Sequence, residues 1–213
     1  MLNLKIVVGS TREGRAADLV TPWVVDRASR HGDFDVDLLD LRDWPLPMFA
    51  ENPQTLGDPS DPTYSDPIVR SWNARIKEGD AYLFITPEYN HSVPGALKNA
   101  IDSVFASFGF RNKPAASVGY SGGIAAAVRA IEHLAHIAIE AEMVPLRNTV
   151  LIPRVRSAFE GMNPVDPVAD LSLGVMLDDL AWWGALLQRA RAAGALPPGG
   201  QRLREAQAQL AAR

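Results

Sequence analysis

The first segment with residue types suited to chemistry is residues 9–15, which read Gly-Ser-Thr-Arg-Glu-Gly-Arg. The hydroxyls of Ser10 and Thr11, the guanidinium groups of Arg12 and Arg15, and the free amides at the start of a following helix can all donate to one phosphate. The glycine spacing matches neither a nucleotide P-loop nor a dinucleotide fingerprint. We therefore expect an anion-binding loop; the simpler alternative is a capped helix start with surface arginines.

A second candidate loop, residues 86–92, reads Thr-Pro-Glu-Tyr-Asn-His-Ser. Tyr89 offers an aromatic face, Asn90 an amide side chain, and the backbone offers successive donors and acceptors. This combination suits a flat heteroaromatic ring with polar edges. A tight turn stabilised by Asn90 is the simpler alternative. We expect His91 to be a solvent-facing loop residue rather than a catalytic base.

The third loop, residues 119–123, reads Gly-Tyr-Ser-Gly-Gly and matches the Gly-x-Ser-x-Gly nucleophile elbow of α/β-hydrolases. That class needs an acid and then a histidine later in the chain, but His133 and His136 on the next predicted helix are the last histidines. Acyl hydrolysis is therefore a remote alternative. We interpret Gly122 and Gly123 as positions where backbone amides can approach a ring edge.

A metal site is the remaining chemical possibility on this helix, because His133, His136 and Glu140 share one helical face at i, i+3 and i+7. A stripe in the middle of a helix lies away from the place where an open α/β sheet binds its ligands, so no metal is expected. Lys98 and Asp102, at i and i+4 on the preceding helix, are predicted to form an ion pair.

Composition narrows the chemistry further. The 213 residues include no cysteine, so the chain has no disulfide, thiolate metal site or dithiol motif, and any redox chemistry must belong to a bound cofactor. A net charge of -4 without a Lys/Arg cluster argues against nucleic acid as a partner. No apolar run approaches the length of a membrane span, so a membrane partner is not expected and the cytoplasm is the expected location.

The three loops need a fold that brings them to one edge. Hydrophobic patterns predict five strands, at residues 2–9, 34–41, 81–86, 115–120 and 144–152, with the second at or near an edge. Helices are expected at residues 15–31, 68–77, 94–105, 124–142 and 171–193. This alternation predicts an α/β three-layer sandwich with a parallel sheet in the order 2-1-3-4-5, whose ligands bind beyond the carboxyl ends of the strands.

Two proline-rich segments interrupt this pattern. Residues 42–67 contain six prolines and are predicted to be a long loop that packs as a lid, binding or interface segment; the prolines are Pro45, Pro47, Pro53, Pro59, Pro62 and Pro67. Residues 153–167 are also predicted to be irregular. A Pro-Pro-Gly-Gly sequence at 197–200 separates one domain, residues 1–195, from a peripheral or flexible tail, residues 196–213.

Taken in order, the motifs resemble those of the NADPH-dependent FMN reductase family. They are Gly-Ser-Thr-Arg with Arg15, then Pro-Glu-Tyr-Asn at 87–90 continuing to Pro-Gly-Ala-Leu-Lys-Asn-Ala-Ile-Asp at 94–102, then Ser-Gly-Gly at 121–123. The resemblance covers roughly residues 3–150 and implies a flavodoxin-like fold. It implies that Ser10, Arg12 and Arg15, together with Thr11, hold the FMN phosphate. It further implies that the ribityl and isoalloxazine groups are lined by Pro87, Glu88, Tyr89, Asn90, Ser121, Gly122 and Gly123.

By the same resemblance the chain is an oxidoreductase that takes electrons from NADPH or NADH and passes them, by a ping-pong mechanism, to flavin, a quinone, an azo compound or a metal oxyanion. No protein group is expected to act as acid or base, since the flavin carries the chemistry. The family implies a homodimer or homotetramer. The alternative from a different class is a flavodoxin-like electron carrier that binds FMN without turning over a nicotinamide.

Overall fold

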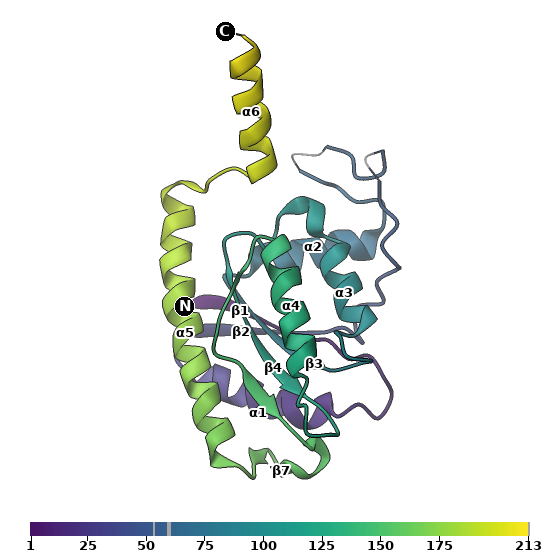
Figure 1. Cartoon of the computed structure of the whole chain (residues 1–213), viewed down its shortest axis with the longest axis vertical. Coiled ribbons are helices and arrows are strands. Elements are labelled where there is room, and N and C mark those ends of the chain that lie inside the picture. Colours follow the sequence, from purple (N-terminus) through teal and green to yellow (C-terminus); the bar gives the residue numbers. More distant parts are fainter. Residues whose placement is uncertain (53, 59–60, 213) are drawn as a thin grey trace.

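The computed structural model describes residues 1–52, 54–58 and 61–212, built around a parallel β-sheet (Figure 1). Its strands lie in the order β2-β1-β3-β4-β5, with β6 also paired to β4, which confirms the predicted order. The strands are β1 (Leu2–Val8), β2 (Phe34–Asp40), β3 (Ala81–Pro87), β4 (Pro114–Tyr120), β5 (Val144–Pro145) and β6 (Val150–Ile152). All seven residues of β3 and of β4 are buried, as central strands require, whereas the edge strand β2 has exposed positions.

The predicted fifth strand, residues 144–152, is not continuous. It is divided into β5 and β6, which pair with opposite ends of β4. Pro145 has no amide hydrogen, so it cannot continue the donor side of the ladder. Leu146 makes one further backbone bond to Ala115, and the next residues leave the sheet, where Asn148 donates to Asp179 at 2.6 Å.

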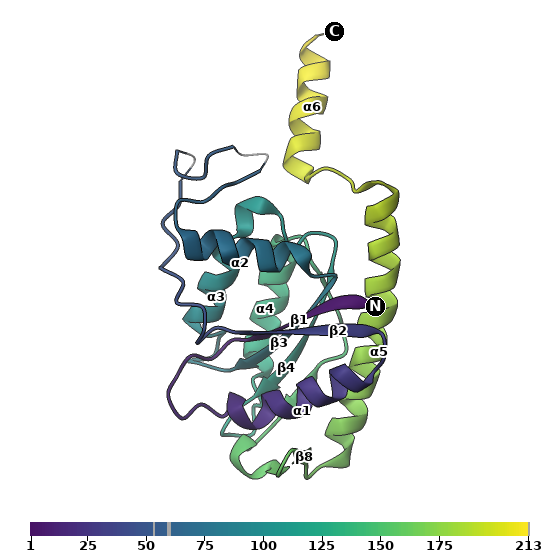
Figure 2. The same ribbon diagram turned by 180° about the vertical axis from the view of Figure 1, so that it is seen from behind.

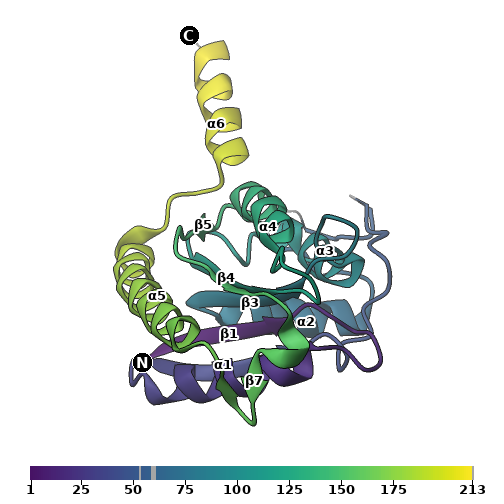
Figure 3. The same ribbon diagram turned by 60° about the horizontal axis from the view of Figure 1, so that its bottom comes forward.

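Helices cover both faces of the sheet and complete the predicted three-layer sandwich. Figures 2 and 3 show α1 and α5 on one side and the helices α2, α3 and α4 on the other. Each layer has its own core, one joining α1 and α5 to the sheet and one joining the other three. The helices are α1 (Ala17–Arg30), α2 (Pro67–Glu78), α3 (Gly95–Asp102), α4 (Val128–Glu140), α5 (Pro167–Gly194) and α6 (Gly199–Ala211).

Several helix ends differ from the sequence prediction. The helix expected from residue 124 begins only at Val128, because Ala126 and Ala127 adopt left-handed φ angles of 50° and 65°. The helix expected at 94–105 ends at Asp102, and a separate 3₁₀ turn (Phe105–Ser107) follows. The helix expected from residue 171 begins at Pro167, since Asp166 caps it by accepting from the Val168 amide at 2.9 Å.

The segment between α4 and α5 contains short elements. After β6 come a 3₁₀ turn (Val155–Ser157) and a small hairpin of β7 (Phe159–Glu160) and β8 (Asn163–Pro164). The segment predicted to be irregular therefore keeps a local antiparallel pair.

The proline-rich segment 42–67 contains no strand or helix before Pro67 among the residues that the structure describes, as predicted; Pro53 and Pro59 lie outside them. Asn99 on α3 anchors it, donating to the Pro47 carbonyl and accepting from the Phe49 amide, both at 2.8 Å. The segment is thus held over the α3 layer.

The predicted tail includes α6, a helix with no buried residue that extends away from the body (Figure 1); Arg213 lies outside the described residues. Within the described ranges, no helix combines the length and apolar character needed to cross a bilayer.

Candidate functional site

The carboxyl ends of β1, β3 and β4 bring the three predicted loops to one edge of the sheet. Val8 is in register with Ile85, and Pro87 with Tyr120, so residues 9–15, 88–92 and 121–123 leave the sheet side by side. The first two loops touch directly, because the Ser10 and Tyr89 hydroxyl oxygens lie 2.6 Å apart. The sequence-based prediction that these loops share one site is therefore supported by the topology.

The first loop presents a row of unused donors. Within residues 1–52, the backbone amides from Ser10 to Gly14 make no hydrogen bond to a protein acceptor. Thr11 and Arg12 are exposed, and the Arg12 guanidinium carbon lies 5.5 Å from the centre of the Tyr89 ring. Among the described residues Arg12 forms no ion pair, so its charge stays available to an anion.

Arg15, unlike Arg12, forms ion pairs within the protein. Its side chain is only 5% exposed and makes a bidentate pair with Asp40 at the end of β2, with one contact at 2.6 Å. It also donates to Asp18 at 2.8 Å and to the Ser10 carbonyl. Burial alone would raise the pKa of Asp40, but hydrogen bonds from Arg15 and the Arg42 amide outweigh it and hold that pKa below its ordinary value. Arg15 thus ties the loop to the neighbouring strand.

The second loop is a tight reverse turn. Asn90 and His91 both have left-handed φ angles, 50° and 66°, and the turn closes an antiparallel bridge between Tyr89 and Ser92. Both side chains are exposed, as expected for His91, and neither backbone amide has a partner in the described structure. The turn expected as the simpler alternative is therefore present, and it presents two donors at the edge of the sheet.

Glu88, at the start of this loop, is held by a residue that the sequence reasoning missed. Its side chain is 7% exposed and pairs with Arg129 on α4. The hydrogen bond from Arg129 holds the pKa of Glu88 below its ordinary value. Only the fold brings these two residues together. A single arginine in a helical pattern gives no signal of this contact, so the sequence reasoning missed it.

Ser121 shapes the third loop. This is the residue that the hydrolase alternative needs as its nucleophile. Ser121 Oγ donates to the Gly123 carbonyl at 3.1 Å and accepts from the Ala126 amide at 2.9 Å. His133 instead contacts Ser92, with its Nδ1 2.9 Å from Ser92 Oγ. The amides of Gly122 and Gly123 have no partner among the described residues, and a Cβ at either position would meet nothing within 4 Å. The serine therefore organises a loop whose glycines face open space.

Comparison with known proteins bears on this arrangement. The model of the NADPH-dependent FMN reductase family matches residues 2–156, which span the sheet and all three loops. The chain belongs to this family. It is therefore an NAD(P)H-dependent oxidoreductase that uses FMN.

Several relatives illustrate the family. An NAD(P)H-dependent FMN reductase of Schizosaccharomyces pombe is 29% identical over 78% of this chain and 80% of its own length. One from Pseudomonas aeruginosa is 36% identical over 55% of this chain and 62% of its own. The structure of FerB, an NAD(P)H:(acceptor) oxidoreductase from Paracoccus denitrificans, has a TM-score of 0.70 at 25% identity and covers 87% of this chain and 98% of its own.

The residues present fit the FMN of an NADPH-dependent FMN reductase. The cofactor combines an anionic phosphate with a ring whose edge carries acceptors. The three loops supply hydroxyls, backbone amides without a partner among the described residues, and the Arg12 guanidinium, which forms no ion pair with them. Tyr120, the last residue of β4, adds a buried hydroxyl with no partner in the described structure, and burial raises its pKa. Sequence reasoning passed over Tyr120 because it occupies the variable position of the glycine-serine motif.

A cavity of about 330 Å³ adjoins the first loop of this FMN reductase. It lies between Thr11, the start of the proline-rich segment and α3, and is lined by Thr11, Leu41, Arg42, Trp44, Pro45, Leu46, Ala96 and Asn99. Trp44 is fixed there by an edge contact with Trp72, whose ring centre is 5.1 Å away. The proline-rich segment thus forms one wall beside the candidate site.

Proposed function

We propose that the chain reduces a small electron acceptor by a ping-pong mechanism, with FMN held at the carboxyl edge of the sheet. Ser10, Thr11 and Arg12 hold the phosphate, and the ring and ribityl chain lie against Pro87, Glu88, Tyr89, Asn90, Ser121, Gly122 and Gly123. The observation that carries this proposal is the convergence, at one edge, of backbone amides from three loops that have no partner in the part of the chain that the structure describes. Arg15 supports the same site by fixing the first loop.

The role proposed for the protein groups is to bind and orient the cofactor. FMN, when bound, supplies the chemistry by accepting a hydride from NADPH or NADH and giving the electrons to the acceptor. The Ser10–Tyr89 contact and the Arg15–Asp40 pair keep the first loop in place. The Glu88–Arg129 pair does the same for the second loop, and Ser121 for the third.

The range of acceptors is inferred from relatives. These include a 2-hydroxy-1,4-benzoquinone reductase of a Burkholderia species, 30% identical over 62% of this chain and 68% of its own, in addition to the FMN reductases. An FMN-dependent NADPH-azoreductase of Staphylococcus haemolyticus is 31% identical over 63% of this chain and 66% of its own. We propose flavins, quinones or azo compounds as acceptors; metal oxyanions stay a prediction from the sequence. The cavity walled by the proline-rich segment is the proposed place for the acceptor's body.

Three further expectations belong to this proposal. Residues 1–195 form the FMN-binding domain and residues 196–213 a peripheral tail. The enzyme works in the cytoplasm and assembles as a homodimer or homotetramer. Chromatography with light scattering measures the assembly directly.

The function is tested by visible spectroscopy on the protein supplied with FMN. Anaerobic addition of NADPH or NADH should bleach the bound flavin, and a quinone added afterwards should restore the colour. Initial rates measured at several donor concentrations, for each of several fixed acceptor concentrations, should give parallel double-reciprocal lines. Bound flavin that neither donor reduces would favour the electron carrier, and intersecting lines would exclude the ping-pong mechanism.

The phosphate assignment predicts the effect of removing Arg12. Arg12→Ala should raise the Kd for FMN at least about tenfold, since one charge-assisted hydrogen bond is worth about 1.5–3 kcal/mol. The stability of the protein without FMN should be unchanged, because Arg12 is exposed and unpaired within the described residues. Fluorescence titration with FMN measures the Kd, and Arg189→Ala on the exposed part of α5 is the matched control. Equal affinities for the two variants would remove Arg12 from the phosphate site.

A further inference from the structure

The long helix α5 is apolar on two opposite faces. One face packs on the sheet through Leu173, Met176, Leu177, Leu180 and Gly184. The other carries five large side chains, each between 37% and 70% exposed, at helical spacing: Val168, Leu171, Val175, Trp182 and Leu186. We call these five residues the outer α5 stripe. A helix that is apolar all round is normally covered on both sides, so the outer α5 stripe requires a partner.

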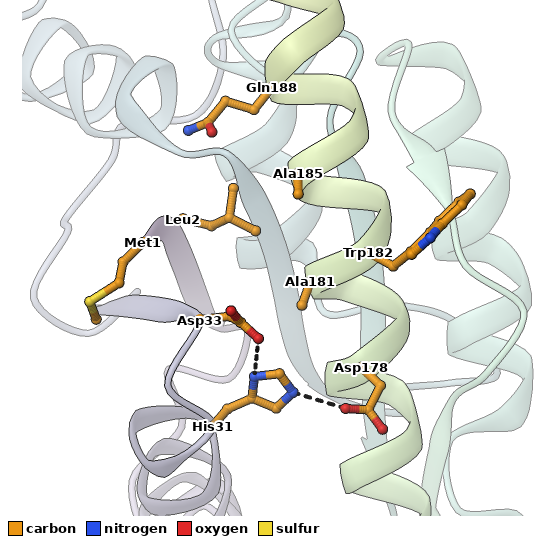
Figure 4. Close-up of a pocket in the computed structure, with 9 residues that line it drawn as sticks. All are labelled: Met1, Leu2, His31, Asp33, Asp178, Ala181, Trp182, Ala185 and Gln188. Atoms are coloured by element: carbon orange, nitrogen blue, oxygen red, sulfur yellow. Dashed lines mark hydrogen bonds and ion pairs between the residues drawn. The ribbon is translucent and has the colours of Figure 1, made fainter.

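Trp182 is the largest residue of this stripe. It is 62% exposed, and its ring meets that of Trp183 edge-on at 5.1 Å. Figure 4 shows Ala181 and Ala185 turned toward Leu2 and the N-terminal strand, while Trp182 projects from the other side of the helix. An exposed tryptophan is the type of residue that often dominates binding energy at protein interfaces.

The tail supplies a matching element. Helix α6 has no buried residue, and Leu203 and Leu210, seven residues apart on one face, are 60% and 73% exposed. All three whole-chain views show it projecting from the body beyond the end of α5 (Figures 1, 2 and 3). An amphipathic helix held away from its own domain is placed to pack against another molecule.

Charge decides between the possible partners of the outer α5 stripe. Asp178, whose side chain is 77% exposed, and Asp179 lie near the middle of the stripe. If two copies of α5 packed antiparallel about this midpoint, four carboxylates would meet and repel one another. The outward helix α6 carries Arg202 and Arg204 against a single acid, Glu205, within its described residues. The charge of α6 is therefore complementary to that of the outer α5 stripe, whereas the charge of a second α5 is not.

Asp178 also has a partner on its inner side. Its Oδ1 lies 3.1 Å from Nε2 of His31, and Asp33 contacts the other ring nitrogen (Figure 4). These residues border a cavity of about 450 Å³ between α5 and the N-terminal strand. The contact fixes the carboxylate beside the stripe while its other face stays in solvent, open to a cation on α6.

We propose that α6 of one chain packs across the outer α5 stripe of a second copy, and that the exchange is reciprocal. At about 1.5 Å per residue, the 13 residues of α6 span about 20 Å, and the stripe from residue 168 to 186 spans about 27 Å. Reciprocal exchange is isologous and closes the assembly as a dimer, using each α6 and each outer α5 stripe once. This contact does not depend on the proposed acceptor or on bound FMN.

The absence of native cysteine allows a direct test by disulfide trapping. Val175→Cys and Leu210→Cys chains, mixed and gently oxidised, should give a cross-linked pair that contains one of each. Glu205→Cys, on the opposite side of α6, should not cross-link with Val175→Cys. Cross-links between two Val175→Cys chains would show that α5 packs on α5, and those between two Leu210→Cys chains that α6 packs on α6. Either result, or no cross-link at all, would overturn the proposal.

Sedimentation equilibrium on the full chain supplies an independent measurement. Trp182→Ala should raise the dissociation constant of this contact at least about tenfold, as expected for a central tryptophan. Ending the chain after Pro198 should have an equal or larger effect. Far-UV circular dichroism of both variants reports whether the domain is folded. Folded variants that associate as strongly as the natural sequence would contradict the exchange of α6.

Discussion

Replacing Arg15 by methionine should lower the free energy of unfolding by about 3 kcal/mol at pH 7 and raise the Kd for FMN at least about tenfold. The methionine leaves the Asp40 carboxylate, whose side chain is 19% exposed, without its bidentate partner. It also frees the Ser10 carbonyl and removes the link between the first loop and β2. Urea unfolding and FMN titration measure the two effects.

Two controls separate this positioning role from direct contact with the phosphate. Adding Asp40→Asn to Arg15→Met removes the uncompensated charge and should recover part of the lost stability. A rise in the Kd with unchanged stability of the FMN-free protein would indicate that Arg15 acts by contacting the phosphate and not by holding the loop. That outcome would contradict the positioning role.

The dependence of this effect on pH follows from Asp40. The folded-state pKa of Asp40 lies below its ordinary value, so the stability that the pair contributes is present above about pH 4. It is lost as the pH falls through the folded-state pKa. The difference between Arg15→Met and the natural sequence should therefore shrink at pH 3. An equal difference at pH 3 and pH 7 would contradict an ionic contribution from Asp40.

The convergence of the three loops at one edge could be predicted from the sequence because it depends on local patterns. Apolar runs such as residues 81–86 identify buried parallel strands, and the Gly-rich and Pro-Glu-Tyr-Asn segments follow them directly. The carboxyl ends of parallel strands share one edge, so the loops had to converge. The family resemblance then gave the cofactor, and the family model confirms it.

The direction of individual side chains was not accessible. Arg15 and Asp40 are 25 residues apart, and only the parallel register that sets Val8 beside Asp40 brings them together. The sequence predicts Arg15 as a phosphate ligand equivalent to Arg12 and gives no sign of its pair with Asp40. The Glu88–Arg129 pair was missed for the same reason, since its partners lie 41 residues apart.

The backbone conformation near the third loop could not be predicted from local residue propensities either. Alanine favours helix, so a helix was predicted from residue 124, yet Ala126 and Ala127 are left-handed. Ser121 accepts from the Ala126 amide, and β4 passes so near that a Cβ on Gly119 would lie 2.8 Å from the Ala126 carbonyl. Tertiary packing outweighs intrinsic propensity at this turn.

A second large effect is expected at Lys113, which is 6% exposed and immediately precedes β4, at the opposite end of that strand from the third loop. Its ammonium donates to the carbonyls of Gly109 at 2.7 Å and Lys77 at 2.9 Å, and to the Tyr82 hydroxyl at 3.2 Å. Burial, reinforced by the nearby charge of Arg191, lowers the pKa of Lys113 to about 7. An unfolded lysine keeps its proton up to about pH 10.4.

Between pH 7 and 9.5 the unfolded chain therefore binds a proton that folded Lys113 has lost, so the stability contribution rises with pH in this window. The rise approaches about 1.4 kcal/mol per pH unit and totals about 3 kcal/mol.

Lys113→Met should remove this rise, whatever its effect on stability at pH 7. Urea unfolding at half-unit steps of pH measures it, and Lys77→Met on α2 controls for the loss of one nearby lysine charge. Burial raises the pKa values of Tyr64 and Tyr82, so both stay protonated throughout the window. Parallel stability curves for Lys113→Met and the natural sequence would show that Lys113 keeps its proton when buried, held by the carbonyls that surround it.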